Sequence, residues 1–393
     1  MQHITFPAVF MRGGTSKGIF FRGGVLPEEP KLRDAILLRA LGSPDPYKRQ
    51  IDGLGGASSS TSKAVIVSRS DRPGIDVDYL FAQVDVERPL IDYTANCGNL
   101  SGAVGPFAIS EGLVEAIDGT TSVRIWQVNT SRLIVAHVPV RDGEPVEEGA
   151  YVIDGVPFPS AEIALDFYDP GGSVTGKLLP TGNAVDELDV PAVGVLRVTL
   201  LDAATITVFV RANDVGLVGT ELRPQVDGDV ALLAKLESIR AAAAVRLGLA
   251  ANAQEATRRR PGTPKLALVA APARYRTAGG IDIEAEQVDF VARMISMGTL
   301  HHAFPGTGAI CAAVAAAIPG TVVNEVACVA PGREHSITFG HTSGTIRIGV
   351  TLAERDAIWH AEKARVSRSA RRIMQGEVCI PAALIAAPEL LPA

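Results

Sequence analysis

The sequence has few cysteines, few aromatic residues and no excess of basic residues. Four cysteines in 393 residues, with no CxxC pair, do not form the cysteine framework of a disulfide-stabilised secreted protein. Lys and Arg number 37 against 43 Asp and Glu, which gives a formal net charge of −6. A chain this acidic has no overall positive field for nucleic acid, so an anionic ligand must be held by local donors in a pocket.

Long apolar runs are also missing. The longest, residues 309–319, is far shorter than the roughly 18 residues that span a bilayer. The N-terminal stretch MQHITFPAVFMRGG has no basic segment followed by a long apolar one, which is the pattern of a signal peptide. We therefore expect a cytoplasmic protein with reduced thiols that binds neither membrane nor nucleic acid.

Most of the chain consists of short β-like runs broken by Gly, Pro and Asp. Their β-branched residues and short lengths favour strands, for example at 64–67, 123–128, 133–138, 195–200, 206–210, 266–269 and 346–350. Apolar spacing predicts helices at 30–41 and 229–249, and further helix candidates within 286–297 and 353–370.

Two segments are apolar nearly all round, residues 98–113 and 306–318. A helix without a polar face must be enclosed by other structure, and the Gly and Ala content lets a sheet curl closely around it. We therefore predict an α+β fold of two similar domains, each a curved mixed sheet or barrel around a central apolar helix. The two helix N-termini are expected to face one cleft that holds the active site. The expected domains are 1–180 and 181–393, and the last C-terminal strand can cross back to the first domain.

Cys97 lies in the turn Asn96-Cys97-Gly98-Asn99 that opens the first apolar segment. A thiol at a helix N-terminus is close to the positive end of the helix dipole, which favours its use as a proton carrier or nucleophile. A small buried side chain beside a tight turn is an equally good interpretation. For Cys311, Cys328 and Cys379, which lie in apolar or strand-like runs, simple burial is expected.

Lys63 follows a run of hydroxyl residues and enters a strand-like segment. It can act as a base if it is desolvated, although an isolated lysine is more often a solvated loop residue. The stretch 12–18 (RGGTSKG) lacks the spacing of a phosphate-binding loop, so nucleotide binding is rejected. Its backbone N–H groups and hydroxyls can still hold carboxylates.

The second half contains a matching turn at 305–309 (PGTGA), which offers a second anion-binding N-terminus. The neighbouring His301 and His302 cannot both point one way on a strand, so a metal pair is not expected. Residues 341–344 (HTSG) are interpreted as a hairpin turn. No H-E-x-x-H, G-x-S-x-G or G-x-G-x-x-G stands in a fitting context, which removes support for metal hydrolysis, a hydrolase triad and a dinucleotide enzyme.

Taken together, the motifs resemble the PrpF family, the 2-methylaconitate isomerases of propionate breakdown, within the diaminopimelate-epimerase-like fold. The resemblance covers nearly the whole chain and runs through FMRGGTSKGIFF, GSPDPY, IDGLGGASSSTSKAVIV, DVDYLFAQV, NCGNLSGAVGPFAI, LLPTGNAVDEL, SMGTLHHAFPGTGA, FGHTSGTIRIGV and SRSARRIMQGEV.

The resemblance implies a catalytic pair. Diaminopimelate-type epimerases carry one cysteine at the start of each central helix, but the turn at 305–309 has no thiol, so a symmetric two-thiol epimerase is not expected. PrpF-like enzymes use a lysine with the cysteine, and the matching residues are Lys63 and Cys97. Thr342 stands where the family usually has proline, which puts the stiffness of that turn in doubt.

The implied function is a cofactor-independent isomerase of unsaturated tricarboxylates, which moves 2-methylaconitate from trans to cis in the 2-methylcitrate cycle. One base removes a proton, charge spreads through the conjugated carboxylate, and reprotonation completes the reaction. Which of Lys63 and Cys97 takes the first proton stays open. No metal or organic cofactor is required. The substrate-binding candidates are Arg12, Thr15, Ser16, Asn96, Gly98, Asn99, His302, Thr307, Gly308 and Ser343.

Other functions stay open. Related enzymes act on 4-oxalomesaconate, methylitaconate or aconitate. From a different class, the chain can be a non-catalytic accessory protein of a 2-methylcitrate dehydratase, which would not need Lys63 or Cys97. A homodimer and functional coupling to an aconitase-like dehydratase are the partner expectations.

Overall fold

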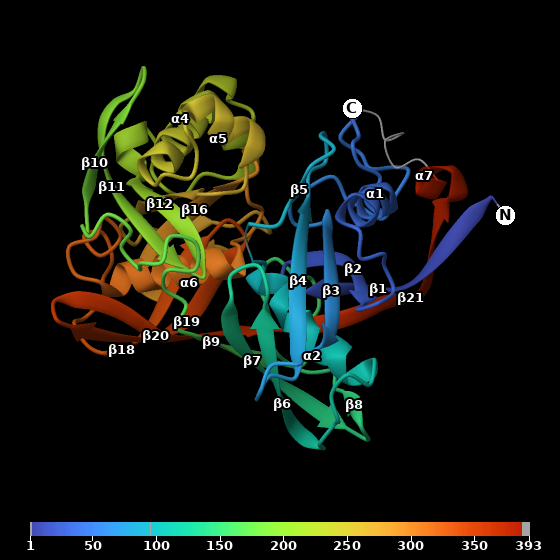
Figure 1. Ribbon diagram of the computed structural model, residues 1–393. Coiled ribbons are helices and arrows are strands. Elements are labelled where there is room, and N and C mark those ends of the chain that lie inside the picture. Colours follow the sequence, from blue (N-terminus) through green and yellow to red (C-terminus); the bar gives the residue numbers. More distant parts are fainter. Residues whose placement is uncertain (1, 95, 387–393) are drawn as a thin grey trace. The chain divides into compact units, whose positions relative to one another are not determined.

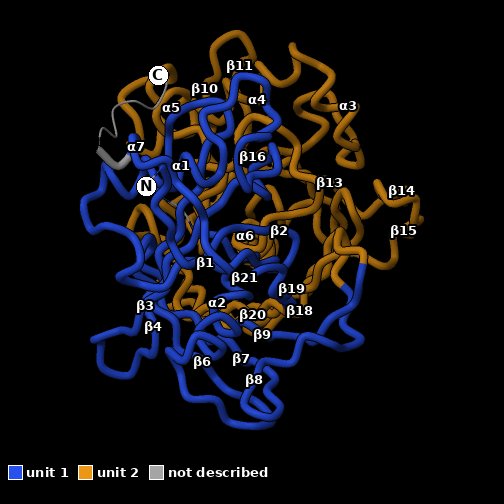
Figure 2. Tube along the Cα trace, turned by 90° about the vertical axis from the view of Figure 1, so that its right-hand side faces the viewer, with its two compact units in different colours: residues 1–152, 158–165, 368–393 blue, residues 153–157, 166–367 orange. Residues whose placement is uncertain are grey.

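A computed structural model describes residues 2–94 and 96–386 (Figure 1). The chain divides into two compact units (Figure 2). Unit 1 comprises residues 1–152, 158–165 and 368–393, and unit 2 comprises residues 153–157 and 166–367. The expected boundary between residues 180 and 181 therefore lies inside unit 2, and the C-terminal strand lies in unit 1.

Unit 1 is built mostly from strands. They are β1 (His3–Gly13), β2 (Ser16–Arg22), β3 (Lys63–Arg69), β4 (Val77–Val84), β5 (Ile91–Asp92), β6 (Gly119–Gln127), β7 (Arg132–Arg141), β8 (Glu144–Pro145) and β21 (Ala370–Pro381). Its helices are α1 (Pro30–Leu41), α2 (Gly98–Ser110) and α7 (Ala382–Ala386). Strand β9 (Ile163–Tyr168) begins in unit 1 and ends in unit 2.

Unit 2 has the same kind of composition. Its strands are β10 (Asp186–Val190), β11 (Gly194–Ala203), β12 (Thr205–Arg211), β13 (Lys265–Ala270), β14 (Tyr275–Arg276), β15 (Asp282–Ile283), β16 (Phe290–Ser296), β17 (Thr299–Leu300), β18 (Glu334–His341), β19 (Gly344–Arg355) and β20 (Ile358–Arg368), whose last residue belongs to unit 1. Its helices are α3 (Arg223–Asp227), α4 (Val230–Arg246), α5 (Ala253–Arg259) and α6 (Gly306–Ala317), with 3₁₀ turns at Ala212–Val215 and Ala285–Gln287.

The two units share one strand topology. Along β1, β2, β3, β4, β6 and β7 the pairings alternate antiparallel, parallel, antiparallel, parallel and antiparallel. The series β11, β12, β13, β16, β18 and β19 repeats that alternation. Parallel neighbours need a crossover: α1 and α4 connect the first parallel pair of each unit, and α2 and α6 the second. The expected pair of similar α+β domains is confirmed.

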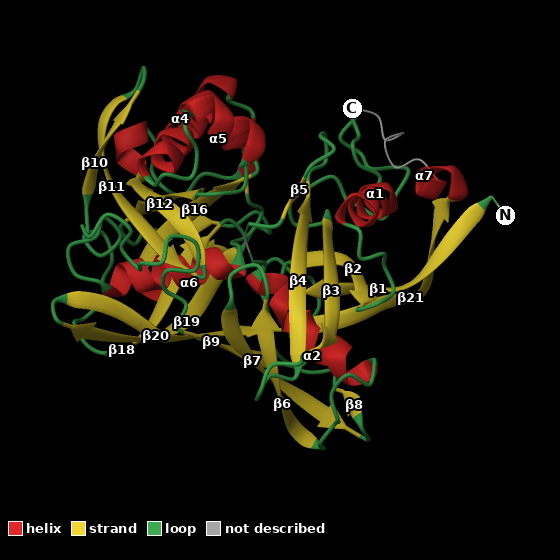
Figure 3. Cartoon of the chain, in the orientation of Figure 1, coloured by secondary structure: helices red, strands yellow, loops and turns green. Residues whose placement is uncertain are grey.

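Helices α2 and α6 are the enclosed central helices (Figure 3). Every residue of α6 is buried, and so is α2 from Gly98 to Ile109. Small residues allow this enclosure: a Cβ on Gly105 would lie 2.7 Å from Val138 Cγ2. Within unit 1, α2 packs against β1, β6 and β7, and within unit 2, α6 packs against β11, β12 and β19.

Helices α1 and α4 cover the opposite faces of their strands. In unit 1, Ile36 and Leu37 of α1 share a hydrophobic cluster with Ala64 and Ile66 of β3. Side chains alternate between the two faces of a strand. Lys63 therefore lies on the face of β3 that points away from α1, which is the inner face of the unit.

Two helix predictions are wrong. Residues 290–296 form β16, a strand buried on both faces, so its apolar residues do not alternate with polar ones and no strand period is visible. Residues 353–370 lie mostly in the β19–β20 hairpin, although their Ala, Glu, Lys and Arg content is typical of helices. Asp356 and Ala357 turn the chain with φ of 52° and 61°, which is the geometry of a tight hairpin.

The other predicted elements are present. The helix at 30–41 forms as predicted, and the one at 229–249 is α4, shorter by a few residues at its C-terminal end. Within residues 2–94 and 96–386, no helix is both long enough and apolar enough to cross a membrane.

Candidate active site

Lys63 is the first residue of β3 and is only 7% exposed. The hydroxyl-rich loop before it is ordered by its own backbone, since the N–H groups of Thr61 and Ser62 both donate to Ser58 O. The Lys63 ammonium lies 4.9 Å from the centre of the Phe81 ring. The solvated loop position that is usual for a lone lysine is therefore not what the fold provides.

Gln83 lies opposite Lys63 in the β3–β4 register. Lys63 Nζ donates to Gln83 Oε1 over 2.5 Å. The amide is fixed from its other end, because Gln83 Nε2 donates to the carbonyl oxygens of Ser59 at 3.1 Å and Ser62 at 3.0 Å. Gln83 therefore presents its oxygen, and no charge, to the lysine.

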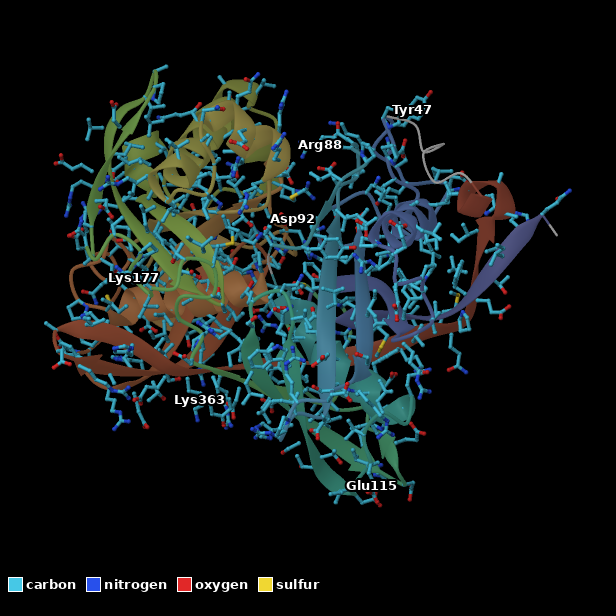
Figure 4. The ribbon with its side chains drawn as sticks, viewed as in Figure 1. Tyr47, Arg88, Asp92, Glu115, Lys177 and Lys363 are labelled. Atoms are coloured by element: carbon cyan, nitrogen blue, oxygen red, sulfur yellow. The ribbon has the colours of Figure 1, made fainter. Side chains whose placement is uncertain are left out.

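Cys97 is the N-cap of α2 and is 8% exposed. Its Sγ accepts the backbone N–H of Leu100 at 3.5 Å, as an N-cap side chain does. Tyr79 Oη and Ser101 Oγ both donate to the Cys97 carbonyl. Asp92, labelled in Figure 4, lies opposite Gln83 in the β4–β5 register, and its carboxylate accepts the N–H and the hydroxyl of Thr94.

Lys63 and Cys97 are direct neighbours. Burial lowers the pKa of Lys63 below its ordinary value, while the charge of the Cys97 thiol group and a hydrogen bond with it oppose part of that shift. A buried amine held this way reaches its neutral form at a lower pH than a solvated lysine. The pair can therefore give and take protons in a site largely shielded from water.

A buried arginine completes this cluster. Arg368 Nε donates to Asn99 Oδ1 at 3.0 Å, and Asn99 Nδ2 donates to Thr15 Oγ1 at 3.0 Å. Burial lowers the pKa of Arg368 to about 10, with the charges of Tyr151 and Cys97 acting against that shift. Unit 1 therefore places a guanidinium close to the cysteine at the start of α2.

The turn between β1 and β2 packs tightly on the same helix end. Gly14 has φ of 49°, and a Cβ there would lie 2.6 Å from Asn99 Oδ1 and 2.9 Å from Arg368 Cδ. Arg12, predicted to bind substrate, donates to Gly14 O, to Ser369 O and Oγ and to Ser160 Oγ. Through these contacts Arg12 holds the β1–β2 turn against Ser160 and Ser369.

Within unit 1, the structure brings together most of the predicted residues of that half. Thr15 and Asn99 are bonded to each other, Asn96 and Gly98 flank Cys97, and Ser16 is buried opposite Gly13 in the β1–β2 pairing.

Unit 2 carries the remaining candidates on a second network. Ser343 Oγ donates to His302 O at 2.5 Å, and Thr342 Oγ1 donates to the carbonyls of His301 at 3.0 Å and Ala303 at 3.1 Å. The threonine hydroxyl thus connects its turn to the neighbouring loop. Burial and the charge of Arg223 lower the pKa of His302.

Helix α6 begins differently from α2. Its N-cap is Pro305, which makes no side-chain cap hydrogen bond, and Thr307 and Gly308 are buried in its first turn. Residues 341–344 form the predicted hairpin turn between β18 and β19. Within the described ranges, no group of three or more His, Cys, Asp or Glu side chains is arranged to hold a metal ion.

The other three cysteines differ in burial. Cys311 is buried in α6 as predicted, and burial raises the pKa of its thiol to about 12. Cys328 and Cys379 are exposed, so the prediction of burial is wrong for both. Cys379 occupies an outward position of β21 next to the buried Ile380, which the apolar sequence around it conceals.

Comparisons with known proteins identify the family of this chain. The family defined by the PrpF protein matches residues 3–381. The chain belongs to the PrpF family. It is 49% identical to a 2-methyl-aconitate isomerase of Cupriavidus necator, over 97% of this chain and 98% of that protein. A 2-methyl-aconitate isomerase of Shewanella oneidensis is 48% identical, over 96% and 97%. A 3-methylitaconate isomerase of Eubacterium barkeri is 44% identical, over 96% and 98%.

Solved structures place this PrpF-family chain in the same fold group. The crystal structure of a methylitaconate-delta-isomerase superposes with a TM-score of 0.77 at 43% identity and covers 98% of both chains. A hydroxyproline epimerase from Agrobacterium vitis superposes with a TM-score of 0.56 at 14% identity, over 97% of this chain and 93% of that one. The second likeness shows the fold alone, and it is the epimerase-type fold that the sequence motifs predict.

Two residues of the cluster were not singled out from the sequence, Gln83 and Arg368. Gln83 lies two residues after Phe81 on the inner face of β4, within the motif DVDYLFAQV. Arg368 lies in the motif SRSARRIM, 269 residues from its partner Asn99. Both stand in motifs that carry the family resemblance, which is the signal that could have drawn attention to them.

Proposed function

We propose that this PrpF-family protein isomerises 2-methylaconitate from trans to cis by proton transfer. The observation that carries the proposal is the Lys63–Cys97 pair, a buried lysine with a lowered pKa next to the cysteine that caps α2. The two relatives named 2-methyl-aconitate isomerase, aligned over nearly the whole chain, support the choice of substrate.

The proposed reaction begins with removal of a proton from the carbon next to the double bond. Either neutral Lys63 or the thiolate form of Cys97 takes this proton, and the negative charge spreads into the conjugated carboxylate as a dienolate. Rotation about the bond that has lost double-bond character, followed by reprotonation from the other member of the pair, gives the isomer. A positioned acid or base of this kind contributes about 10²- to 10⁴-fold to a rate.

The developing charge needs fixed donors. In unit 1, the Arg368 guanidinium and the first turn of α2 supply them close to Cys97. We propose the residues around this turn as carboxylate ligands, with Arg12 holding the turn. They are Thr15, Ser16, Asn96, Gly98 and Asn99. In unit 2, His302, Thr307, Gly308 and Ser343 remain proposed substrate contacts.

A second candidate function is methylitaconate isomerisation. The 44% identical relative and the superposed crystal structure both carry that activity in their names. The same proton-transfer pair serves either substrate, because both reactions move one proton along an allylic system.

Proton NMR of the purified protein in D2O decides between them. We expect catalytic conversion of trans-2-methylaconitate, with deuterium from solvent at one carbon, and much slower conversion of methylitaconate, 4-oxalomesaconate and aconitate. Faster conversion of methylitaconate would favour the second candidate. A folded protein that converts none of these compounds would remove the proposed function and leave the accessory-protein hypothesis.

Two partner proposals accompany this function. A homodimer is one, and light scattering after gel filtration measures it directly as a mass of twice 41.2 kDa. Functional coupling to an aconitase-like dehydratase is the other, because such an enzyme can exchange the cis unsaturated acid with a hydroxy acid by adding or removing water.

A further inference from the structure

The hydrogen bonds around Gln83 define which end of its amide faces Lys63. Gln83 Nε2 donates to Ser59 O and Ser62 O, and both acceptors belong to the backbone of the loop that precedes Lys63. A flipped amide would point its oxygen at two carbonyl oxygens and its N–H groups at the lysine, so the observed orientation is the favourable one. Gln83 Oε1 is therefore held as an acceptor for Lys63 Nζ at 2.5 Å.

This contact restricts the direction of the amine. A neutral lysine has two N–H bonds and one lone pair. Lys63 gives one N–H to Gln83, is hydrogen-bonded to Cys97 and lies 4.9 Å from the centre of the Phe81 ring. Because the Cε bond and the N–H to Gln83 occupy two tetrahedral directions, the lone pair, the orbital that accepts the proton of a substrate, is confined to the other two.

The charge of the acceptor matters as much as its direction. An amide oxygen stabilises an ammonium far less than a carboxylate at the same distance, because it carries no net charge. The titratable groups around Lys63 are Cys97 at the start of α2 and, facing Cys97, Tyr79 from β4 and the Arg368 cation. No carboxylate is among the groups whose charges act on Lys63 in the described part of the chain; Asp92, opposite Gln83 in the β4–β5 register, lies one strand further away and accepts two hydrogen bonds from Thr94.

We propose that Gln83 is the positioning residue of the proton-transfer pair, an uncharged acceptor that aims the Lys63 amine and leaves it free to exist without a proton. This inference rests on the proposed function for its catalytic meaning, but its structural content concerns Lys63 alone. A glutamate at this position would keep the size and the acceptor for Lys63, add a charge, and lose the N–H groups that donate to Ser59 O and Ser62 O, a loss for which Gln50→Glu below is the control.

The test is the Gln83→Glu variant, followed by two independent readouts. The first is the titration of Lys63 by NMR of protein labelled with ¹³C at lysine Cε, the signal being assigned by its loss in Lys63→Met. The second is the pH profile of kcat/KM for 2-methylaconitate. We expect the Lys63 midpoint and the acidic limb of the profile to rise together by about one to three pH units. Below the new midpoint, the rate should fall roughly tenfold for each unit.

Two further variants separate charge from packing. Gln83→Met keeps the length but removes the acceptor, so it should lower kcat at every pH by about tenfold without raising the Lys63 midpoint. Gln50→Glu is the matched control, because Gln50 is also buried and bonds to Ser62 Oγ at 2.8 Å, yet it makes no contact with Lys63 Nζ. It should leave the Lys63 midpoint nearly in place.

Several results would overturn the inference. They are an unchanged Lys63 midpoint in folded Gln83→Glu, an equal rise in Gln50→Glu, or full kcat in folded Gln83→Met. Failure of the proposed function is distinct from these, since wild-type protein that converts no substrate would still show the Lys63 titration and its response to Gln83→Glu.

Discussion

The two units place a lysine at the same point of the same topology, yet give it different neighbours. Lys63 opens β3 and Lys265 opens β13, the third strand of each repeated series. Lys63 is buried and bonds to Gln83, whereas Lys265 is half-buried and donates to Ser296 Oγ and Gly262 O at 3.4 Å. The duplicated fold thus keeps the lysine but not its surroundings.

The central helices differ at the same end. The N-cap of α2 is Cys97, and the N-cap of α6 is Pro305, which has no proton to exchange. Two units of similar topology can therefore differ in chemical function. The shared backbone fixes where the helix N-termini and strand ends lie, and a few side chains at those places determine which reactions are possible. This difference supports the proposal that the proton-transfer residues lie in unit 1.

Removing each lysine in turn should give the largest difference between the two units. Lys63→Met should lower kcat by about 10³-fold or more, because the base is lost. Lys265→Met should lower it by less than about tenfold, because no thiol caps the neighbouring helix. Lys177, a surface lysine labelled in Figure 4, gives the control variant Lys177→Met. Steady-state measurements of kcat for the three folded variants test this expectation. Equal losses of kcat in Lys63→Met and Lys265→Met would contradict the role proposed for Lys63.

Cysteine replacement should have the next largest effect. Cys97→Ser keeps a hydroxyl that can cap α2 but exchanges protons poorly, so kcat should fall by about 10²-fold while the melting temperature changes little. The exposed Cys379 supplies a matched control, and Cys379→Ser should retain full activity. Full turnover by Cys97→Ser would show that the thiol takes no part in catalysis.

Glycine substitutions compare how tightly the first turns of α2 and α6 pack against their surroundings. A Cβ on Gly13 would lie 2.6 Å from Asn99 O and 3.0 Å from Leu100 Cα, both backbone atoms of α2, so Gly13→Ala must displace the helix start. We expect a loss of about 1–3 kcal/mol in the free energy of unfolding, with reduced kcat. On Gly308 the nearest atoms are the flexible Met294 Sδ and Cε, so Gly308→Ala should cost less than about 1 kcal/mol.

Urea titrations of these two variants measure the difference. Equal losses of stability would mean that the backbone contact at Gly13 relaxes as easily as the Met294 side chain does at Gly308.

The smallest expected effect concerns the threonine that replaces the family's proline. Thr342→Val removes the hydroxyl that bonds to the carbonyls of His301 and Ala303, and should cost about 1 kcal/mol in the free energy of unfolding. Ser122→Ala, at a more exposed hydroxyl of unit 1, serves as the control. An unchanged urea midpoint for Thr342→Val would mean that this bond does not stabilise the turn.

The sequence is informative where one local pattern decides the structure. The all-apolar segments that became α2 and α6 need no tertiary information to be recognised as enclosed helices. Residues 353–370 show the opposite case, because helix-favouring composition there is overruled by a tight turn and by pairing with neighbouring strands.

The site residues likewise fall into those that sequence motifs reveal and those that only the fold reveals. Lys63 and Cys97 stand in recognisable motifs, but their contact is made by the fold. Gln83 reaches Lys63 only through the β3–β4 register, and Arg368 reaches Asn99 only because the chain returns to unit 1 after residue 367. Neither contact joins residues that are close in the sequence, so local sequence patterns do not reveal it.

The most direct test of Lys63 as part of the proton-transfer pair follows isomerisation and deuterium uptake together, by proton NMR in D2O, for wild-type protein and Lys63→Met. We expect wild-type protein to convert trans-2-methylaconitate to the cis isomer with solvent deuterium at one carbon, and folded Lys63→Met to show neither conversion nor exchange. Wild-type rates of both processes in Lys63→Met would contradict it.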